Sequence, residues 1–220
     1  MSIGSKRDLE GMKAAGRAVA AAIREMRRAV RPGMTTKQLD LIGENLLTGL
    51  GARSAPQMVY KFPGFCCISV NDEAVHGIPG PRVLNAGDLV KLDVTAELHG
   101  YIADACVTVV ISPAQPEAEA LADAARKAFY KGLEHVQAGK PIRDWGKAVD
   151  HEVRGAGFSV LKDLCGHGVG RTIHEAPRNI FNYDEPRMRE RFVDGSVIAI
   201  EPIISAGTNK VVTDADGWTL

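Results

Sequence analysis

Three carboxylates lie in stretches of the chain that are too apolar to be solvated edges. Asp93 ends the apolar run GDLVKLD, and Glu201 ends the similar run GSVIAIE. Asp104 lies within YIADACVTVVI, which is rich in β-branched residues. Burying an ionised carboxylate costs free energy unless a cation or hydrogen-bond donors compensate its charge. These acids are therefore candidates for a chemical role.

Asp93 and Asp104 have a particular relationship in the expected structure. A hairpin that turns near residues 98–100 would place the two acids about opposite each other on one face of a sheet. Like charges so placed repel unless they share a proton, basic side chains intervene, or a divalent cation lies between them. The pair alone is compatible with a salt-bridge network or with a metal site.

A glycine-rich segment carries two histidines. In CGHGVGRTIHEAP (165–177), His167 and His174 are separated by glycines where a helix or strand would place packing side chains, so we expect a thin loop. An imidazole with several carboxylates is a mixed, oxygen-rich donor set. Such a set suits Mn²⁺, Fe²⁺, Co²⁺ or Zn²⁺ better than Ca²⁺ or a structural zinc. The histidines and Glu201 together favour a metal over a salt-bridge network.

The elements that must position these residues are helices and short strands. Apolar residues that step by three and four predict helices, and apolar or β-branched runs bounded by turn residues predict strands. The expected helices cover residues 8–30, 35–51, 117–136 and 142–156, and the expected strands cover 66–70, 89–96 and 101–111.

The chain also reads as internally duplicated. Gly33 and Gly51 have the same spacing as Gly139 and Gly157, and each pair brackets an expected helix. Chance is the alternative, because many helices end in glycine. The matching acids Asp93 and Glu201 favour duplication, which predicts one domain over 1–220 with similar halves at about 1–112 and 113–220.

Composition limits the function classes. Among the 220 residues, Lys plus Arg and Asp plus Glu are balanced at 27 each, so no basic surface for nucleic acid is expected. No stretch approaches the roughly 18 apolar residues of a membrane span. The four cysteines show no CxxC spacing. We expect a cytoplasmic, monomeric protein without nucleic-acid or membrane partners.

The ordered set of motifs resembles the type I methionine aminopeptidases, from the first helix to the last residue. The motifs that carry this resemblance are NDEAVHGIP with His76, KLDVT, YIADACVTV, CGHGVGR, TIHEAP, IAIEP and DGWT (216–219). The family has an α+β pita-bread fold with pseudo-two-fold symmetry, in which helices back a curved antiparallel sheet. The resemblance implies that fold here.

The resemblance also implies site roles. It implies a centre of one or two divalent metal ions, Co, Mn, Fe or Zn, with the ligands Asp93, Asp104, His167 and Glu201. Metal coordination lowers the pKa of water toward neutrality, and Glu201 would carry the proton of that water to the leaving amine. His174 would bind the carbonyl oxygen as it becomes an oxyanion, and His76 would contact the scissile amide nitrogen region. Taken singly, His76 fits a capped turn and His174 a surface position equally well; the ordered set favours the catalytic roles.

The side-chain pocket follows from the same resemblance. Phe62, Cys67 and Trp218 lie where the family lines its methionine site, and a thioether suits such an apolar wall. Pro56, Val59 and Ile173 stand where cysteine or aromatic residues are expected. The expected substrates are the N-termini of peptides and nascent polypeptides, with the exact side-chain preference open to change.

The sequence departs from the family pattern after DGWT. The family has a further strand there with a second metal-bridging glutamate, whereas this sequence ends at Leu220. Asp214 and Asp216, in a turn-like stretch, are not expected to replace it. Two alternatives therefore stand beside a methionine aminopeptidase: a proline-directed peptidase of the same fold, or a catalytically impaired module that binds peptides.

Overall fold

The computed structural model describes residues 1–220, which form two compact units. The first unit consists of Ser5–Ala118, Gly170–Ile173 and Val212–Leu220. The second unit consists of Met1–Gly4, Glu119–Val169 and His174–Val211. None of the helices is both long and apolar enough to span a membrane.

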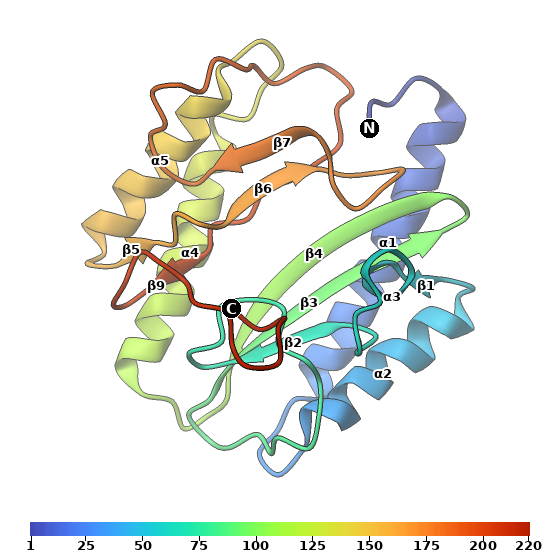
Figure 1. Ribbon diagram of the computed structural model, residues 1–220, viewed down its shortest axis with the longest axis vertical. Helices are drawn as coiled ribbons and strands as arrows, with labels where there is room; N and C mark the ends of the chain where they lie inside the picture. Colours follow the sequence, from blue (N-terminus) through green and yellow to red (C-terminus); the bar gives the residue numbers. More distant parts are fainter. The chain divides into compact units, whose positions relative to one another are not determined.

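Helices and strands follow the expected order along the chain (Figure 1). The helices are α1 (Lys6–Ala29), α2 (Thr36–Gly49), α3 (Ala55–Tyr60), α4 (Pro116–Leu133) and α5 (Ile142–Gly155). The strands are β1 (Arg53–Ser54), β2 (Cys67–Val70), β3 (Leu89–Leu98), β4 (Tyr101–Val110), β5 (Ser159–Val160), β6 (Cys165–Gly168), β7 (Glu175–Phe181), β8 (Ile198–Ala199) and β9 (Ile204–Ser205). The four predicted helices and three predicted strands form, with ends shifted by a few residues.

The first unit is built on the long strand β3. Strand β4 pairs with β3 along its whole length, while β1 and β2 pair with its other edge, all antiparallel. Helix α1 packs against β3, β4 and α2, and it passes behind the strands in Figure 1. The contact is close, because a Cβ on Gly11 of α1 would stand 2.2 Å from the Tyr101 ring.

The β3–β4 hairpin corrects one expectation. Its turn is formed by His99 and Gly100, both with positive φ, as in a two-residue type I′ turn. This register pairs Asp93 with Cys106 and Thr95 with Asp104. Asp93 and Asp104 therefore share a face, as expected, but are diagonal neighbours rather than directly opposite. The turn falls within the expected residues 98–100, and only the pairing of the two acids differs.

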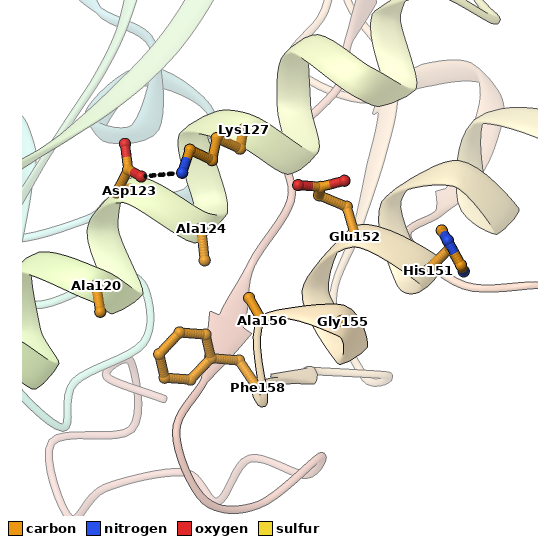
Figure 2. A pocket seen from close by; sticks show the side chains of 9 residues that line it. All are labelled: Ala120, Asp123, Ala124, Lys127, His151, Glu152, Gly155, Ala156 and Phe158. Atoms are coloured by element: carbon orange, nitrogen blue, oxygen red, sulfur yellow. Dashed lines mark ion pairs between the residues drawn. The ribbon is translucent and has the colours of Figure 1, made fainter.

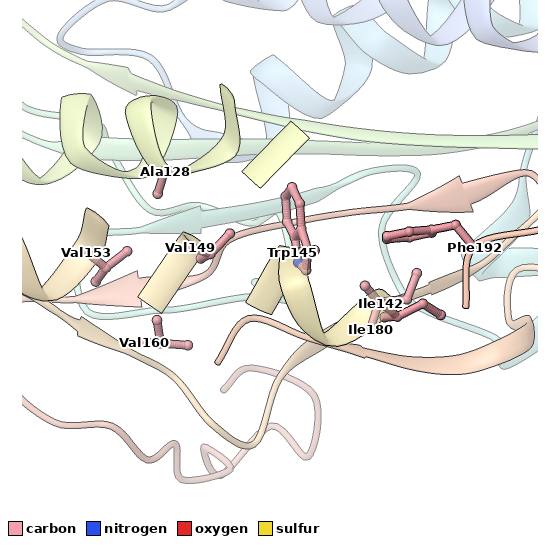
Figure 3. Close-up of a cluster of buried hydrophobic side chains, with 8 residues drawn as sticks. All are labelled: Ala128, Ile142, Trp145, Val149, Val153, Val160, Ile180 and Phe192. Atoms are coloured by element: carbon pink, nitrogen blue, oxygen red, sulfur yellow. The ribbon is translucent and has the colours of Figure 1, made fainter. Parts of the chain in front are cut away.

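The second unit has its own core between helices and strands (Figure 3). Trp145 and Val149 of α5 are fully buried there, together with Ala128 of α4 and Ile180 of β7. Gly132 of α4 leaves room for the indole, since a Cβ at this position would lie 2.6 Å from Trp145. Small residues on α4 therefore allow the largest side chain of α5 into the core.

The strands of the second unit correct a second expectation. The segment around His167 was expected to be a loop, but Cys165–Gly168 is strand β6, which lies between β7 and β8. Added Cβ atoms on Gly166 and Gly168 would lie 2.3 and 2.2 Å from the carbonyl oxygens of Ala199 and Ala176. The glycines thus permit close strand packing.

The two units repeat local hydrogen bonds. Gly33 N–H donates to the Leu84 carbonyl in the first unit, and Gly139 N–H donates to the Phe192 carbonyl in the second, both at 2.8 Å. Both glycines have positive φ, 86° and 83°, which side chains disfavour. Each unit combines helices with antiparallel strands, so the architecture is α+β.

Candidate metal centre

The first unit brings the two predicted aspartate ligands to one face of its sheet. Asp93, in β3, has Cys67 of β2 and Cys106 of β4 as its cross-strand neighbours. Asp104 lies on β4 beside Thr95. Both acids are partly exposed. A strand with ladder partners on both sides fixes the backbone of Asp93, so this carboxylate projects from a rigid support.

Thr95 orients the second aspartate. Its hydroxyl donates to Oδ1 of Asp104 at 2.8 Å, and the threonine is buried. The sequence analysis missed this residue. The signal was present, because Thr95 lies two residues after Asp93 on a strand, and period-two alternation places both on one face.

The predicted pocket residues also come together within the first unit. The rings of Phe62 and Trp218 meet edge to face, with centroids 5.4 Å apart. Burial raises the pKa of the Cys67 thiol well above its ordinary value, and the negative charge of Asp93 is the second cause. Cys67 is therefore a neutral, apolar group, which suits a wall that contacts a thioether or alkyl side chain.

His76 is held close to these residues by main-chain contacts. Leu220 N–H donates to the Val75 carbonyl at 3.2 Å, and Ile68 N–H donates to the Gly77 carbonyl at 2.9 Å. His76 itself has φ of 58°, a left-handed conformation that is uncommon outside glycine. Desolvation lowers the pKa of His76 and Asp104 partly offsets this effect, so the ring favours its neutral form.

The second unit brings its three predicted residues together. Nε2 of His167 lies 3.5 Å from Oε1 of Glu201, and the rings of His167 and His174 have centroids 4.1 Å apart. Nδ1 of His167 lies 3.0 Å from the Gly168 carbonyl oxygen. A carbonyl only accepts, so Nδ1 carries a proton, and Nε2 is the ring nitrogen that faces Glu201. His167 is buried, while His174 is exposed.

Each unit supplies only part of the predicted ligand set. No group of three or more His, Cys, Asp or Glu side chains in the structure is arranged to hold a metal ion. The donors nevertheless have suitable chemistry: two aspartates on one sheet face in the first unit, one of them oriented by Thr95, and an imidazole beside a glutamate in the second. Carboxylates with an imidazole fit a divalent transition metal.

A hollow in the second unit, shown in Figure 2, is unrelated to this set. It is an open groove of about 450 Å³ between α4 and α5, with small residues such as Ala124 and Gly155 in its lining and Asp123, Lys127 and Glu152 among its charged residues. None of its lining residues is a predicted site residue.

Known proteins are similar to this chain over nearly its whole length. Residues 10–218 match metallopeptidase family M24. Methionine aminopeptidase 2 of Bacillus subtilis is 47% identical over the full chain, which covers 88% of that protein. A methionine aminopeptidase of Staphylococcus epidermidis is 39% identical over 99% of the chain and 87% of its own length.

Solved structures agree with these relatives. The crystal structure of methionine aminopeptidase from Thermotoga maritima has a TM-score of 0.95 and 34% identity, and the match covers 100% of this chain and 88% of that one. Prolidase from Pyrococcus furiosus has a TM-score of 0.78 at 23% identity, covering 91% of this chain and 57% of its own, and therefore shares the fold.

Proposed function

Because this chain belongs to metallopeptidase family M24, we propose that it removes the N-terminal methionine from peptides and nascent proteins. The chain is a hydrolase of the aminopeptidase type, and the expected α+β pita-bread fold is confirmed. The observation that carries the substrate proposal is the 47% identity to a methionine aminopeptidase over the whole chain.

The alternatives are less well supported. The proline-directed relatives are similar at the level of fold, at 23% identity or below. A catalytically impaired module is not favoured either, since relatives at 47% and 39% identity are methionine aminopeptidases. Action in the cytoplasm, where thiols stay reduced, is part of the proposal and fits four free cysteines.

The proposed metal ligands are Asp93, Asp104, His167 and Glu201. When bound, one or two divalent ions would supply Lewis-acid polarisation and a nucleophilic water at neutral pH. Support comes from the donor chemistry: Thr95 orients Asp104, and Nδ1 of His167 is committed to the Gly168 carbonyl. Which ion the protein uses, Co, Mn, Fe or Zn, is left open by this donor set.

The side chains around these ligands have separate proposed tasks. Glu201 accepts the proton of the attacking water and delivers it to the leaving amine. His174, exposed and next to His167, donates to the carbonyl oxygen as negative charge develops. His76 contacts the scissile amide region, and its neutral form allows it to accept or donate.

The substrate side chain would lie against the apolar residues of the first unit. Phe62 and Trp218 offer ring edges and faces, and Cys67 offers a neutral thiol. A methionine thioether is polarisable and suits aromatic contacts. We therefore propose these three residues as the wall that selects methionine.

The test is a hydrolysis assay with Met-Ala and X-Pro peptides, each with Co²⁺ or Mn²⁺ and with a chelator. We expect methionine release that requires metal. Cleavage of X-Pro peptides alone would favour the proline-directed alternative, and metal-loaded protein that cuts neither peptide would contradict the proposal.

A further inference from the structure

Glu201 lies between strands β8 and β9, which belong to two different sheets of the second unit. Strand β8 ends at Ala199 and β9 begins at Ile204, so no strand covers residues 200–203. An acid that must be placed accurately therefore cannot rely on a continuous ladder, and another contact must fix its backbone.

A buried asparagine provides such a contact. Asn182, which follows β7, is 0% exposed, and its Nδ2 donates to the main-chain carbonyl of Glu201 at 2.8 Å. Its Oδ1 accepts from Nε1 of Trp145 at 3.2 Å. The amide thus links helix α5 to the backbone of the glutamate.

The chemistry of the two partners fixes the amide orientation. An indole N–H only donates and a carbonyl only accepts, so Oδ1 must face Trp145 and Nδ2 must face Glu201. An aspartate of the same shape would place an oxygen against the carbonyl of Glu201. The site therefore distinguishes asparagine from its closest isostere.

The anchor of this link is itself rigid. Trp145 is fully buried in the core shown in Figure 3, and its ring meets Phe129 edge to face at 6.1 Å. A Cβ on Gly146 would stand 2.3 Å from the Tyr183 carbonyl oxygen, so α5 approaches the segment around Asn182 closely. Tight packing at both ends leaves the amide little freedom.

We propose that Asn182 is a positioning residue for Glu201, with Trp145 holding the Asn182 amide in the orientation that supports it. This inference rests on the proposed role of Glu201 as metal ligand and base. Groups behind metal ligands are known to change metal affinity or activity by about 10- to 100-fold when they are removed. We expect an effect of that size from Asn182.

The experiment compares four variants with the wild type. They are Asn182→Asp, which removes the donor to Glu201; Trp145→Phe, which keeps that donor but frees the amide; Val149→Ala, a control in the same core whose side chain makes no hydrogen bond; and Glu201→Gln as reference. The readouts are Mn²⁺ affinity by titration, kcat and KM on a Met-Ala peptide, and thermal midpoint without metal.

Asn182→Asp is expected to bind Mn²⁺ about 10- to 100-fold more weakly and to lose kcat rather than KM. Trp145→Phe should show a smaller loss of the same kind. Val149→Ala should lower the thermal midpoint but keep Mn²⁺ affinity within about twofold, because a core cavity costs stability rather than ligand placement.

Each outcome supports or overturns the positioning role of Asn182. Wild-type affinity and kcat in a folded Asn182→Asp variant would overturn the inference, as would an equal loss of affinity in Val149→Ala. If Asn182→Asp does not fold, Trp145→Phe decides by the same criterion. Wild-type behaviour of Glu201→Gln would instead remove the proposed role of Glu201, which is a separate failure.

Discussion

Asp93 of the first unit and Glu201 of the second end similar apolar runs, yet the two units support them differently. Asp93 lies inside the continuous strand β3, with pairing partners in β2 and β4. Glu201 lies between the short strands β8 and β9, and a buried side-chain amide holds its carbonyl. The backbone of Asp93 is held by main-chain pairing. The backbone of Glu201 is held by the Asn182 amide, which Trp145 of α5 orients.

This difference predicts which substitutions disturb the proposed ligands of each unit. In the first unit, a substitution on the sheet face should affect the ligand and leave the backbone in place. In the second unit, changes at Trp145 or Asn182 should reach the ligand through the side-chain amide. The experiments below probe the comparison in order of decreasing effect.

Asp104→Asn is expected to have the largest effect. The exchange keeps the shape but removes a charged ligand, and losing several kcal/mol of transition-state stabilisation lowers kcat/KM by about 10³-fold or more. The thermal midpoint without metal should change little, since β3–β4 pairing is intact. Full turnover by this variant would remove Asp104 from the metal site.

His174→Ala should separate catalysis from metal binding in the second unit. The loss of an oxyanion donor is expected to lower kcat by about 10²- to 10³-fold. Metal content, measured by elemental analysis, should match the wild type. If metal were lost instead, the roles assigned to His167 and His174 would have to be exchanged.

Thr95→Val tests the first unit in the way that Asn182→Asp tests the second. Removing the hydroxyl that donates to Asp104 should weaken Mn²⁺ binding by about 10-fold, the lower end of the range for such supporting groups. Because β3 keeps its ladder, we expect a smaller loss than in Asn182→Asp. An equal or larger loss would contradict the proposed difference between the units.

A substitution of Glu97 is expected to have the smallest effect, because it changes stability and not metal binding. Burial raises its pKa, but hydrogen bonds from Arg53 and from Gly100 N–H outweigh burial, so the net pKa is below the ordinary value. A lowered pKa in the folded state contributes stability above the unfolded pKa, near 4.3, and this is lost as pH falls through the folded pKa.

Glu97→Gln should therefore lower the free energy of unfolding by about 1–3 kcal/mol at pH 7. The difference from the wild type should shrink at pH 3. Urea unfolding at both pH values measures it, and a constant difference would show that the Glu97 charge does not stabilise the hairpin turn.

Much of this arrangement follows from sequence patterns. Periodicity predicted the helices and the strands that carry Asp93 and Asp104, because both depend on neighbouring residues. The exact hairpin register was missed because it depends on the φ angles of His99 and Gly100. Strand β6 was not predicted because its glycines read as a loop in the sequence. They are needed because carbonyl oxygens of Ala199 and Ala176, from other segments, approach them closely.

The role of Asn182 had no local signal at all. Its partners Glu201 and Trp145 are 19 and 37 residues away in the chain, and a single asparagine after a strand has many ordinary explanations. Contacts of this kind are set by tertiary packing, which no periodic pattern encodes.

The central claim is that the proposed ligands Asp93, Asp104, His167 and Glu201 are all needed to bind metal, and Mn²⁺ titration of two double variants tests it most directly. One variant combines Asp93→Asn with Asp104→Asn, and the other combines His167→Ala with Glu201→Gln. We predict that either pair abolishes tight binding while circular dichroism shows an intact fold. Tight binding that survives the loss of one pair would show that this pair does not hold the ions, and would contradict the account.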